Sequence, residues 1–184
     1  MRWSTFDPEA QQVLLDARRR AMAAGRRSIT SAQLLAGCLG SASVIQVLDS
    51  VGIDPVEAST RLGERPLPDR SDLLAVLGID VGAVAQALPA VESTPWLLRR
   101  WMTRPLRITL ETPSSSIRFS ASGRKVLEVG VWHAKRDHRL VSALDLLRGV
   151  LSDGRDPHHQ CLMQDEHAAR RLFASLFEPD RAGT

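Results

Sequence analysis

Cysteine and histidine are the side chains in this sequence that could support nucleophilic catalysis or hold a metal. The chain has two cysteines, Cys38 and Cys161, and five histidines. His158 precedes Cys161 by three positions, so the two could meet on a helix, but the sequence indicates no third group to orient the histidine. Neither cysteine lies in a CxxC or CxxH pattern, and no histidine pair has the HExxH arrangement of a zinc site. We therefore expect no metal site and no catalytic residue, and a Cys161–His158 enzyme stays as a third function hypothesis.

Arginine clusters are the next group of residues that could do chemistry. Arg99, Arg100, Arg104 and Arg107 could contact the phosphates of a nucleic acid, with salt-dependent DNA retention as the sign. The formal net charge of +3 and the pI of about 9.5 are only mildly basic, so a basic helical nucleic-acid-binding protein is the alternative function. We interpret Arg18-Arg19-Arg20 and Arg26-Arg27 as solvated faces. The GxxxxGK[ST] pattern that cradles nucleotide phosphates is absent, and we expect no cofactor.

Composition favours helices as the elements that must position these residues. The 184 residues suit one domain or two packed half-domains. Tyrosine is absent and phenylalanine and tryptophan number four each, which disfavours a sandwich or barrel. The start of the chain lacks a signal-peptide profile, and no apolar run approaches the roughly 20 residues that span a bilayer. We expect an all-α, soluble, cytoplasmic protein without a membrane partner.

Capping and periodicity predict where the helices lie. Asp7-Pro8-Glu9 reads as an N-cap, an N1 proline and a first-turn acid, and Gly25 ends that first helix. A short basic helix with Trp96 and Trp101 is expected after Thr94-Pro95, residues 63 to 71 read as a linker, and 105 to 118 is the least helical stretch. The remaining helices are expected from Ser31, at 44–51, from Asp54-Pro55 to about 62, and at 73–88, 120–135, 142–152 and 157–177.

Internal repeats run through the chain at two spacings. Residues 47–62 recur at 73–88, a spacing of 26. A longer repeat relates Phe6, Val13, Leu14 and Ala21 to Phe119, Val126, Leu127 and Ala134 at a spacing of 113. It continues at a spacing of 112, where Ile29, Leu34, Leu35, Gly37 and Leu39 match Val141, Leu146, Leu147, Gly149 and Leu151. Two copies of one helical unit would bury their apolar faces against each other, which predicts a pseudo-twofold bundle.

This ordered set of residues resembles the double repeat of the Clp ATPase N-terminal domain family. The first copy runs from Phe6-Asp7 through Gly25-Arg26 and Ile29 to Leu34-Leu35, and the stretch IRFSASGRKVLEVG in the second copy is the nearest match. The extra helix between the copies looks like that of actinobacterial stand-alone members without ATPase modules. The resemblance divides the chain into a first repeat (1–62), a linker with extra helices (63–116), a second repeat (117–178) and a tail (179–184).

The resemblance implies a non-enzymatic module that binds a peptide, a protein substrate or a cyclic-peptide antibiotic. Such a module would act as an adaptor or regulator of a Clp protease, in contact with a Clp ATPase, or as a decoy that sequesters Clp-directed antibiotics. Ala32 and Leu144 replace the glutamates around which the family binds phosphoarginine, and a guanidinium needs a carboxylate partner. The implied peptide-binding residues, in which aromatic rings are flanked by a cation and an acid, are Trp3, Phe6, Leu14, Phe119, Arg124, Glu128 and Val131.

Overall fold

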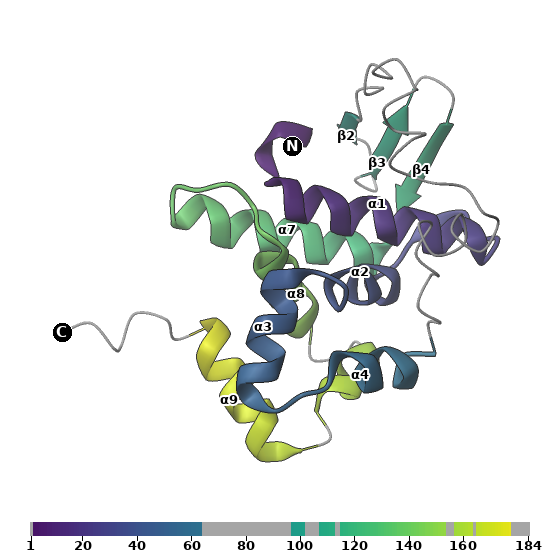
Figure 1. The fold of residues 1–184 in the computed structure, drawn as a ribbon. Helices are drawn as coiled ribbons and strands as arrows, with labels where there is room; N and C mark the ends of the chain where they lie inside the picture. The colour runs from purple at the N-terminus through teal and green to yellow at the C-terminus, as the bar shows by residue number, and fades with distance from the viewer. Residues whose placement is uncertain are drawn as a thin grey trace, which may run out of the picture.

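Helices make up most of the structure, which is a computed structural model that describes residues 2–63, 97–101, 107–112, 115–153, 157–163 and 165–177. Figure 1 shows helices from the two ends of the chain packed side by side. The helix expected at 73–88, and with it the second copy of the shorter repeat, lies outside the described residues. The helices are α1 (Pro8–Ala23), α2 (Ser31–Cys38), α3 (Ala42–Val51), α4 (Pro55–Arg61), α7 (Ala121–Arg136), α8 (Ala143–Leu151) and α9 (Glu166–Phe177), with 3-10 turns at Trp3–Thr5 and Pro157–Leu162.

Local capping explains why the long helices begin where they do. Asp7 accepts a hydrogen bond from the backbone N–H of Ala10 (2.7 Å), and Ser120 accepts one from that of Gly123 (3.2 Å). The first start confirms the predicted N-cap, and the second confirms the helix expected from residue 120. The expected helix at 157–177 is instead divided into a 3-10 turn and α9.

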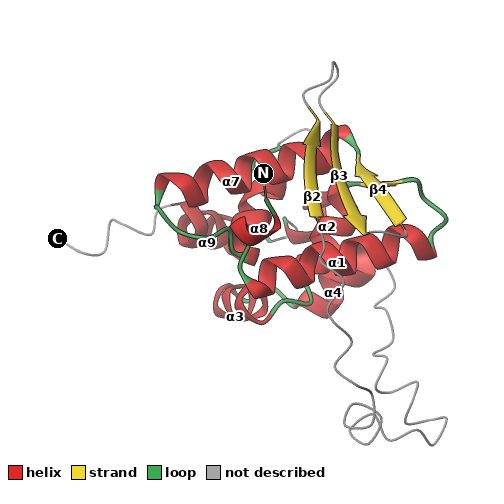
Figure 2. Cartoon of the chain, turned by 90° about the horizontal axis from the view of Figure 1, so that it is seen from above, coloured by secondary structure: helices red, strands yellow, loops and turns green. Residues whose placement is uncertain are grey.

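The prediction of an all-α fold is wrong in one part, because the protein also contains a four-stranded mixed sheet. The strands β1 (Ser28–Ile29), β2 (Leu97–Trp101), β3 (Arg107–Thr112) and β4 (Ser115–Phe119) have the order β1-β4-β3-β2. β1 runs parallel to β4, and the other pairs are antiparallel. In Figures 1 and 2 the three longer strands lie together on one side of the helices.

Strand β2 replaces the short basic helix that we expected to carry Trp96 and Trp101. Trp101 ends β2, and Trp96 lies outside the described residues. Leu98, Leu110 and Ile117 are neighbours in register across three strands, and all three are buried. A strand needs partners for its backbone groups, and these partners come from elsewhere in the chain, so helix-type signals around residue 95 gave the wrong element.

The core lies between two helix pairs, α1 with α2 and α7 with α8, which meet through α2 and α8. Leucine, valine and alanine fill it, together with Phe6 and Phe119. Within the described residues, no single helix is long and apolar enough to cross a membrane; α2 and α3 reach that length and composition only together, with a bend of 81° between them.

Two main-chain bridges connect the helix pairs. The backbone N–H of Asp7, before α1, donates to the carbonyl of Val141, before α8 (2.9 Å). The backbone N–H of Ser120, before α7, donates to the carbonyl of Ile29, before α2 (2.9 Å). In both cases the entry to the first helix of one pair therefore lies beside the entry to the second helix of the other pair.

Candidate functional site

The apolar residues of the expected peptide site are largely in the core. Phe6 and Leu14 are 1% and 0% exposed, and Phe119 and Val131 are 6% and 9% exposed. The side chains of Phe6 and Leu14 therefore cannot contact a ligand in this structure, which corrects their expected place on a binding surface. Trp3 is half-buried in the 3-10 turn before α1 and packs against the core.

The polar residues of the expected site lie on the solvent side of α7. Arg124 is half-buried and Glu128 is exposed, and their i, i+4 spacing places both on one face. The same spacing leads to Trp132 and Arg136, whose side chains are 59% and 55% exposed. Trp132 is thus the exposed aromatic residue of this face, and the sequence analysis missed it although it follows Glu128 by one helical turn.

Trp132 belongs to an aromatic cluster that joins α7 to α9. Its ring meets that of His133 edge-on at 4.8 Å between centroids, and His133 meets Phe177 at 5.9 Å. Phe173, which is 37% exposed, stacks on Phe177 at 5.6 Å. The guanidinium of Arg136 lies 5.5 Å from the centre of the Trp132 ring. Rigid rings with a cation and an acid alongside can bury apolar ligand groups and orient polar ones.

A buried carboxylate is connected to this cluster through Arg148, which also contacts the end of α9. Asp145 is 0% exposed and accepts hydrogen bonds from Arg139 (2.8 Å), Arg148 (2.9 Å) and the backbone N–H of Ser142 (2.9 Å). Burial alone would raise the pKa of Asp145, but these donors outweigh it and hold the pKa below its usual value. Arg148 also donates to the carbonyl of Leu176 (2.5 Å), which fixes the end of α9.

His133 lies at the centre of the aromatic cluster and is largely buried. Burial, together with the nearby guanidinium groups of Arg148 and Arg136, lowers the pKa of His133. The imidazole is therefore neutral at pH 7, and the cluster packs as an apolar unit.

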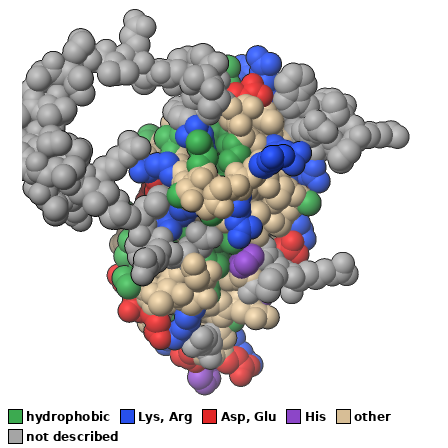
Figure 3. All heavy atoms as spheres, turned by 90° about the vertical axis from the view of Figure 1, so that its right-hand side faces the viewer, with side chains coloured by type: hydrophobic (Ala, Val, Ile, Leu, Met, Phe, Trp, Pro, Cys, Tyr) green, Lys and Arg blue, Asp and Glu red, His purple; other side chains and the backbone are tan. Residues whose placement is uncertain are grey.

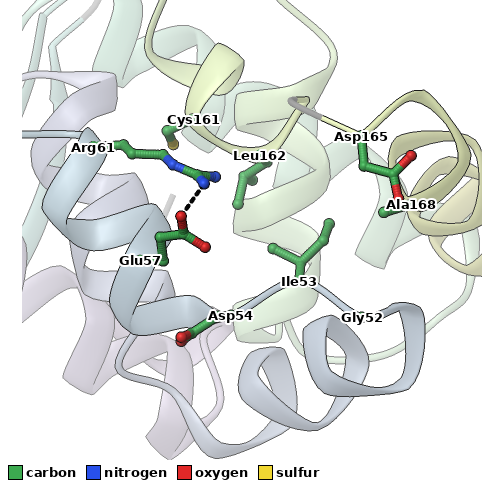
Figure 4. Close-up of a pocket in the computed structure, with 9 residues that line it drawn as sticks. All are labelled: Gly52, Ile53, Asp54, Glu57, Arg61, Cys161, Leu162, Asp165 and Ala168. Atoms are coloured by element: carbon green, nitrogen blue, oxygen red, sulfur yellow. Dashed lines mark hydrogen bonds and ion pairs between the residues drawn. The ribbon is translucent and has the colours of Figure 1, made fainter.

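A pocket of about 330 Å³ lies between α4, the 3-10 turn Pro157–Leu162 and the start of α9. Figure 4 shows Arg61 and Glu57, both on α4, directed toward each other on one side of the pocket, where they form an ion pair. Asp54 and Asp165 accept hydrogen bonds from the backbone N–H groups of Val56 and His167, so both cap helices. The carboxylates of the pocket thus already have structural partners.

The thiol in the wall of this pocket has the wrong acidity for a nucleophile. Burial raises the pKa of Cys161 to about 11, and burial raises that of Cys38 to about 12. Only the thiolate attacks an electrophile, so both groups are protonated at neutral pH. This observation disfavours the Cys161–His158 enzyme hypothesis.

The remaining candidate groups have limited support in the described part of the chain. No group of three or more His, Cys, Asp or Glu residues there could hold a metal ion. Arg99 is exposed on β2 and pairs with Glu111 (3.4 Å). Arg104 and the side chains of Arg100 and Arg107 lie outside the described part.

Comparison with known proteins does not add to these observations. No protein-family model matches the chain, and no curated protein is similar to it at a significant level. The residues and their geometry are therefore the basis for assigning a function.

Proposed function

We propose that this chain is a non-enzymatic peptide- and protein-binding module of the Clp N-terminal type. In this proposal, two copies of one helical unit, α1–α2 and α7–α8, are related by a pseudo-twofold axis. The module acts as an adaptor or regulator of a Clp protease, or as a decoy for Clp-directed cyclic-peptide antibiotics.

The reciprocal main-chain bridges are the observation that carries this proposal. Asp7 and Ser120 are the two donors and are 113 residues apart, whereas Ile29 and Val141 are the two acceptors and are 112 apart. These are the two spacings of the sequence repeat. A pseudo-twofold axis would exchange one bridge with the other, which an accidental sequence similarity would not require.

The helix ends agree with the same spacing. Gly25, after α1, and His138, after α7, are 113 residues apart and have left-handed φ angles of 63° and 52°. The next residue donates back into the helix in both places, from Arg26 to Ala21 (2.8 Å) and from Arg139 to Ala134 (3.0 Å). Residues other than glycine adopt a positive φ in only a few per cent of cases, with histidine among the more frequent, so a left-handed residue at the position equivalent to Gly25 supports a shared backbone design.

The close helix contacts follow the same rule. A Cβ atom added to Gly37 would lie 2.8 Å from the carbonyl oxygen of Val13, and one added to Gly149 would collide with that of Val126. In each helix pair, the backbone of the first helix therefore lies directly against a glycine of the second helix. The repeat predicts that these two glycine positions are equivalent.

The ligand in this proposal binds the exposed face of α7, with Trp132 as its apolar anchor and Glu128 and Arg136 beside it. The positions of the two family glutamates are occupied here by the apolar residues Ala32, which is buried, and Leu144, which is half-buried. Neither position therefore offers a carboxylate. An apolar or unmodified peptide therefore fits the face better than phosphoarginine does.

The test is a calorimetric titration of the protein with a cyclic-peptide Clp antibiotic and with an unfolded, carboxymethylated protein. Trp132→Ala is compared with Val56→Ala, which removes apolar surface from α4, where Val56 is 67% exposed. Truncation of an aromatic anchor costs about 2 kcal/mol or more, so Trp132→Ala should weaken binding at least about tenfold. Val56→Ala should leave it unchanged.

The two ligands separate the two versions of the proposal. Binding of the cyclic peptide that depends on Trp132 supports the decoy, and binding of the unfolded protein alone supports the adaptor. If the folded wild-type protein binds neither ligand, or if both variants weaken binding equally, the peptide-binding proposal is wrong.

A further inference from the structure

The outer face of the sheet carries a row of polar side chains in register. Arg99 pairs with Thr109, Thr109 with Arg118, and Arg118 with Ser28, so the row crosses all four strands. Residues directly opposite each other in a sheet share a face. Arg99 and Arg118 are exposed, whereas the neighbouring row of Leu98, Leu110 and Ile117 is buried on the opposite face.

Two more arginines precede β1, the strand at one edge of the sheet. Arg26 and Arg27 immediately precede Ser28, and both are exposed. We call Arg26, Arg27, Arg99 and Arg118 the arginine face. Figure 3, viewed from the side on which β4 lies in Figure 1, shows Lys and Arg side chains spread over the upper and middle parts of the surface and acidic ones gathered mainly at the lower edge.

The positive charge of this face is largely uncompensated. Among the described side chains of the four strands and of residues 26–27, Glu111 is the one acid, and it pairs with Arg99. Within the described part of the chain, the guanidinium groups of Arg26, Arg27 and Arg118 form no hydrogen bond or ion pair. Neighbouring strands lie about 4.8 Å apart, so the backbones of Arg99 and Arg118, two strands apart, are about 10 Å from each other.

We propose that the arginine face binds the phosphate backbone of a nucleic acid without reading its bases. Guanidinium groups donate two parallel hydrogen bonds to a phosphate, and the hydroxyl group of the exposed Ser116 would add a further phosphate contact. A bound peptide would need apolar anchors, and the described side chains of this face include one exposed large apolar residue, Leu97. The face is separate from the α7 surface, so this inference does not rest on the peptide-binding proposal.

Fluorescence anisotropy of labelled 20-nucleotide single-stranded and duplex DNA of arbitrary sequence tests the proposal between 50 and 200 mM salt. The triple variant Arg26→Gln, Arg27→Gln, Arg118→Gln is compared with Lys125→Gln, Lys135→Gln, Arg170→Gln. The control removes the same charge from α7 and α9. Circular dichroism verifies that both variants are folded.

Wild-type protein should bind with an affinity that falls steeply with salt, because each neutralised phosphate contributes about −0.9 to the log–log slope on duplex DNA and about −0.7 on single strands. In the arginine-face variant the slope should become shallower by the equivalent of about two to three phosphate contacts. Its affinity at low salt should fall at least about tenfold. Equal losses in the control variant would overturn the proposal, as would the absence of binding at 50 mM salt. Binding to polyglutamate as tight as to DNA would also overturn it, in favour of an acidic protein partner.

Discussion

The start of α2 and the start of α8 have the same local geometry but bury different polar side chains. Before α2, the side-chain oxygen of Gln33 accepts from the backbone N–H of Thr30 (2.9 Å). Before α8, the carboxylate of Asp145 accepts from the backbone N–H of Ser142 (2.9 Å). Both side chains are almost fully buried, at 1% and 0% exposure. A neutral amide needs no counter-ion there, whereas a carboxylate does.

The counter-ions are what make the two helix starts differ. Asp145 is paired with Arg139 and Arg148, and Arg148 also donates to the carbonyl of Leu176 at the end of α9. The charged version therefore links the start of α8 to a third helix and to the aromatic cluster that α9 carries. One backbone requirement can be met by two residue types, and the charged type adds a longer-range connection together with a dependence on pH.

Removal of the two buried polar side chains should give the largest difference between the regions. Asp145→Ala should lower the free energy of unfolding by about 3–5 kcal/mol, because it leaves the largely buried Arg148 without its carboxylate. Gln33→Ala should lower it by only about 1–2 kcal/mol, the cost of a lost cap. Urea denaturation followed by circular dichroism measures both. Equal losses would show that the arginines at Asp145 add nothing beyond the cap.

The close helix contacts offer a second comparison, with a smaller effect. Gly149→Ala and Gly37→Ala should both destabilise the protein by about 1–3 kcal/mol through overpacking. The loss should be greater for Gly149, since its added Cβ comes closer to the backbone carbonyl of Val126 than that of Gly37 comes to Val13. Thermal unfolding gives the order of the two variants. A stabilising Gly149→Ala would mean that α7 and α8 can separate without loss.

Acidification should give the smallest effect, and it should appear in the α8 region. The folded-state pKa of Asp145 is below its unfolded value, which is about 3.9 for a free aspartate. The stability that it contributes is therefore present above pH 4 and is lost as the pH falls from there through the lowered pKa. The difference in unfolding free energy between the wild type and Asp145→Asn should shrink over that range.

Gln33→Ala provides the control for this experiment, because an amide does not titrate. The difference between the wild type and Gln33→Ala should stay constant from pH 7 to pH 3. If the Asp145→Asn difference were equally constant, the lowered pKa of Asp145 would not contribute to stability.

Local sequence signals predicted the helices well. Asp7, Ser120 and Gly52 act within one turn of their own position, and the structure places helix boundaries at each of them. The buried residues of α1 recur at spacings of three and four, as one apolar face of a helix requires: Ala10, Val13, Leu14, Ala17 and Ala21. A cap or a periodic face needs no distant partner, which is why these predictions succeeded.

The strands and the site were harder to predict. Ile108 and Leu110 alternate with polar residues, a period-two signal that could have identified β3, but β2 depends on its pairing with β3. Phe6 and Phe119 were expected on a binding surface but are buried. A short sequence pattern does not specify whether an aromatic side chain points to the core or to solvent. Trp132 became the exposed ring instead, since α8 and α2 cover one side of α7 and leave Trp132 on the other.

The helix starts and ends, the apolar faces and the spacings of 113 and 112 that recur in the main-chain bridges can all be read along the chain. These features depend on interactions within one or two helical turns or on the order of residues along the chain. Three other features result from tertiary packing: Asp145 is buried between two arginines, β1 pairs with the distant β4, and Trp132 faces solvent. Such outcomes depend on which surfaces meet when helices and strands from different parts of the chain pack together.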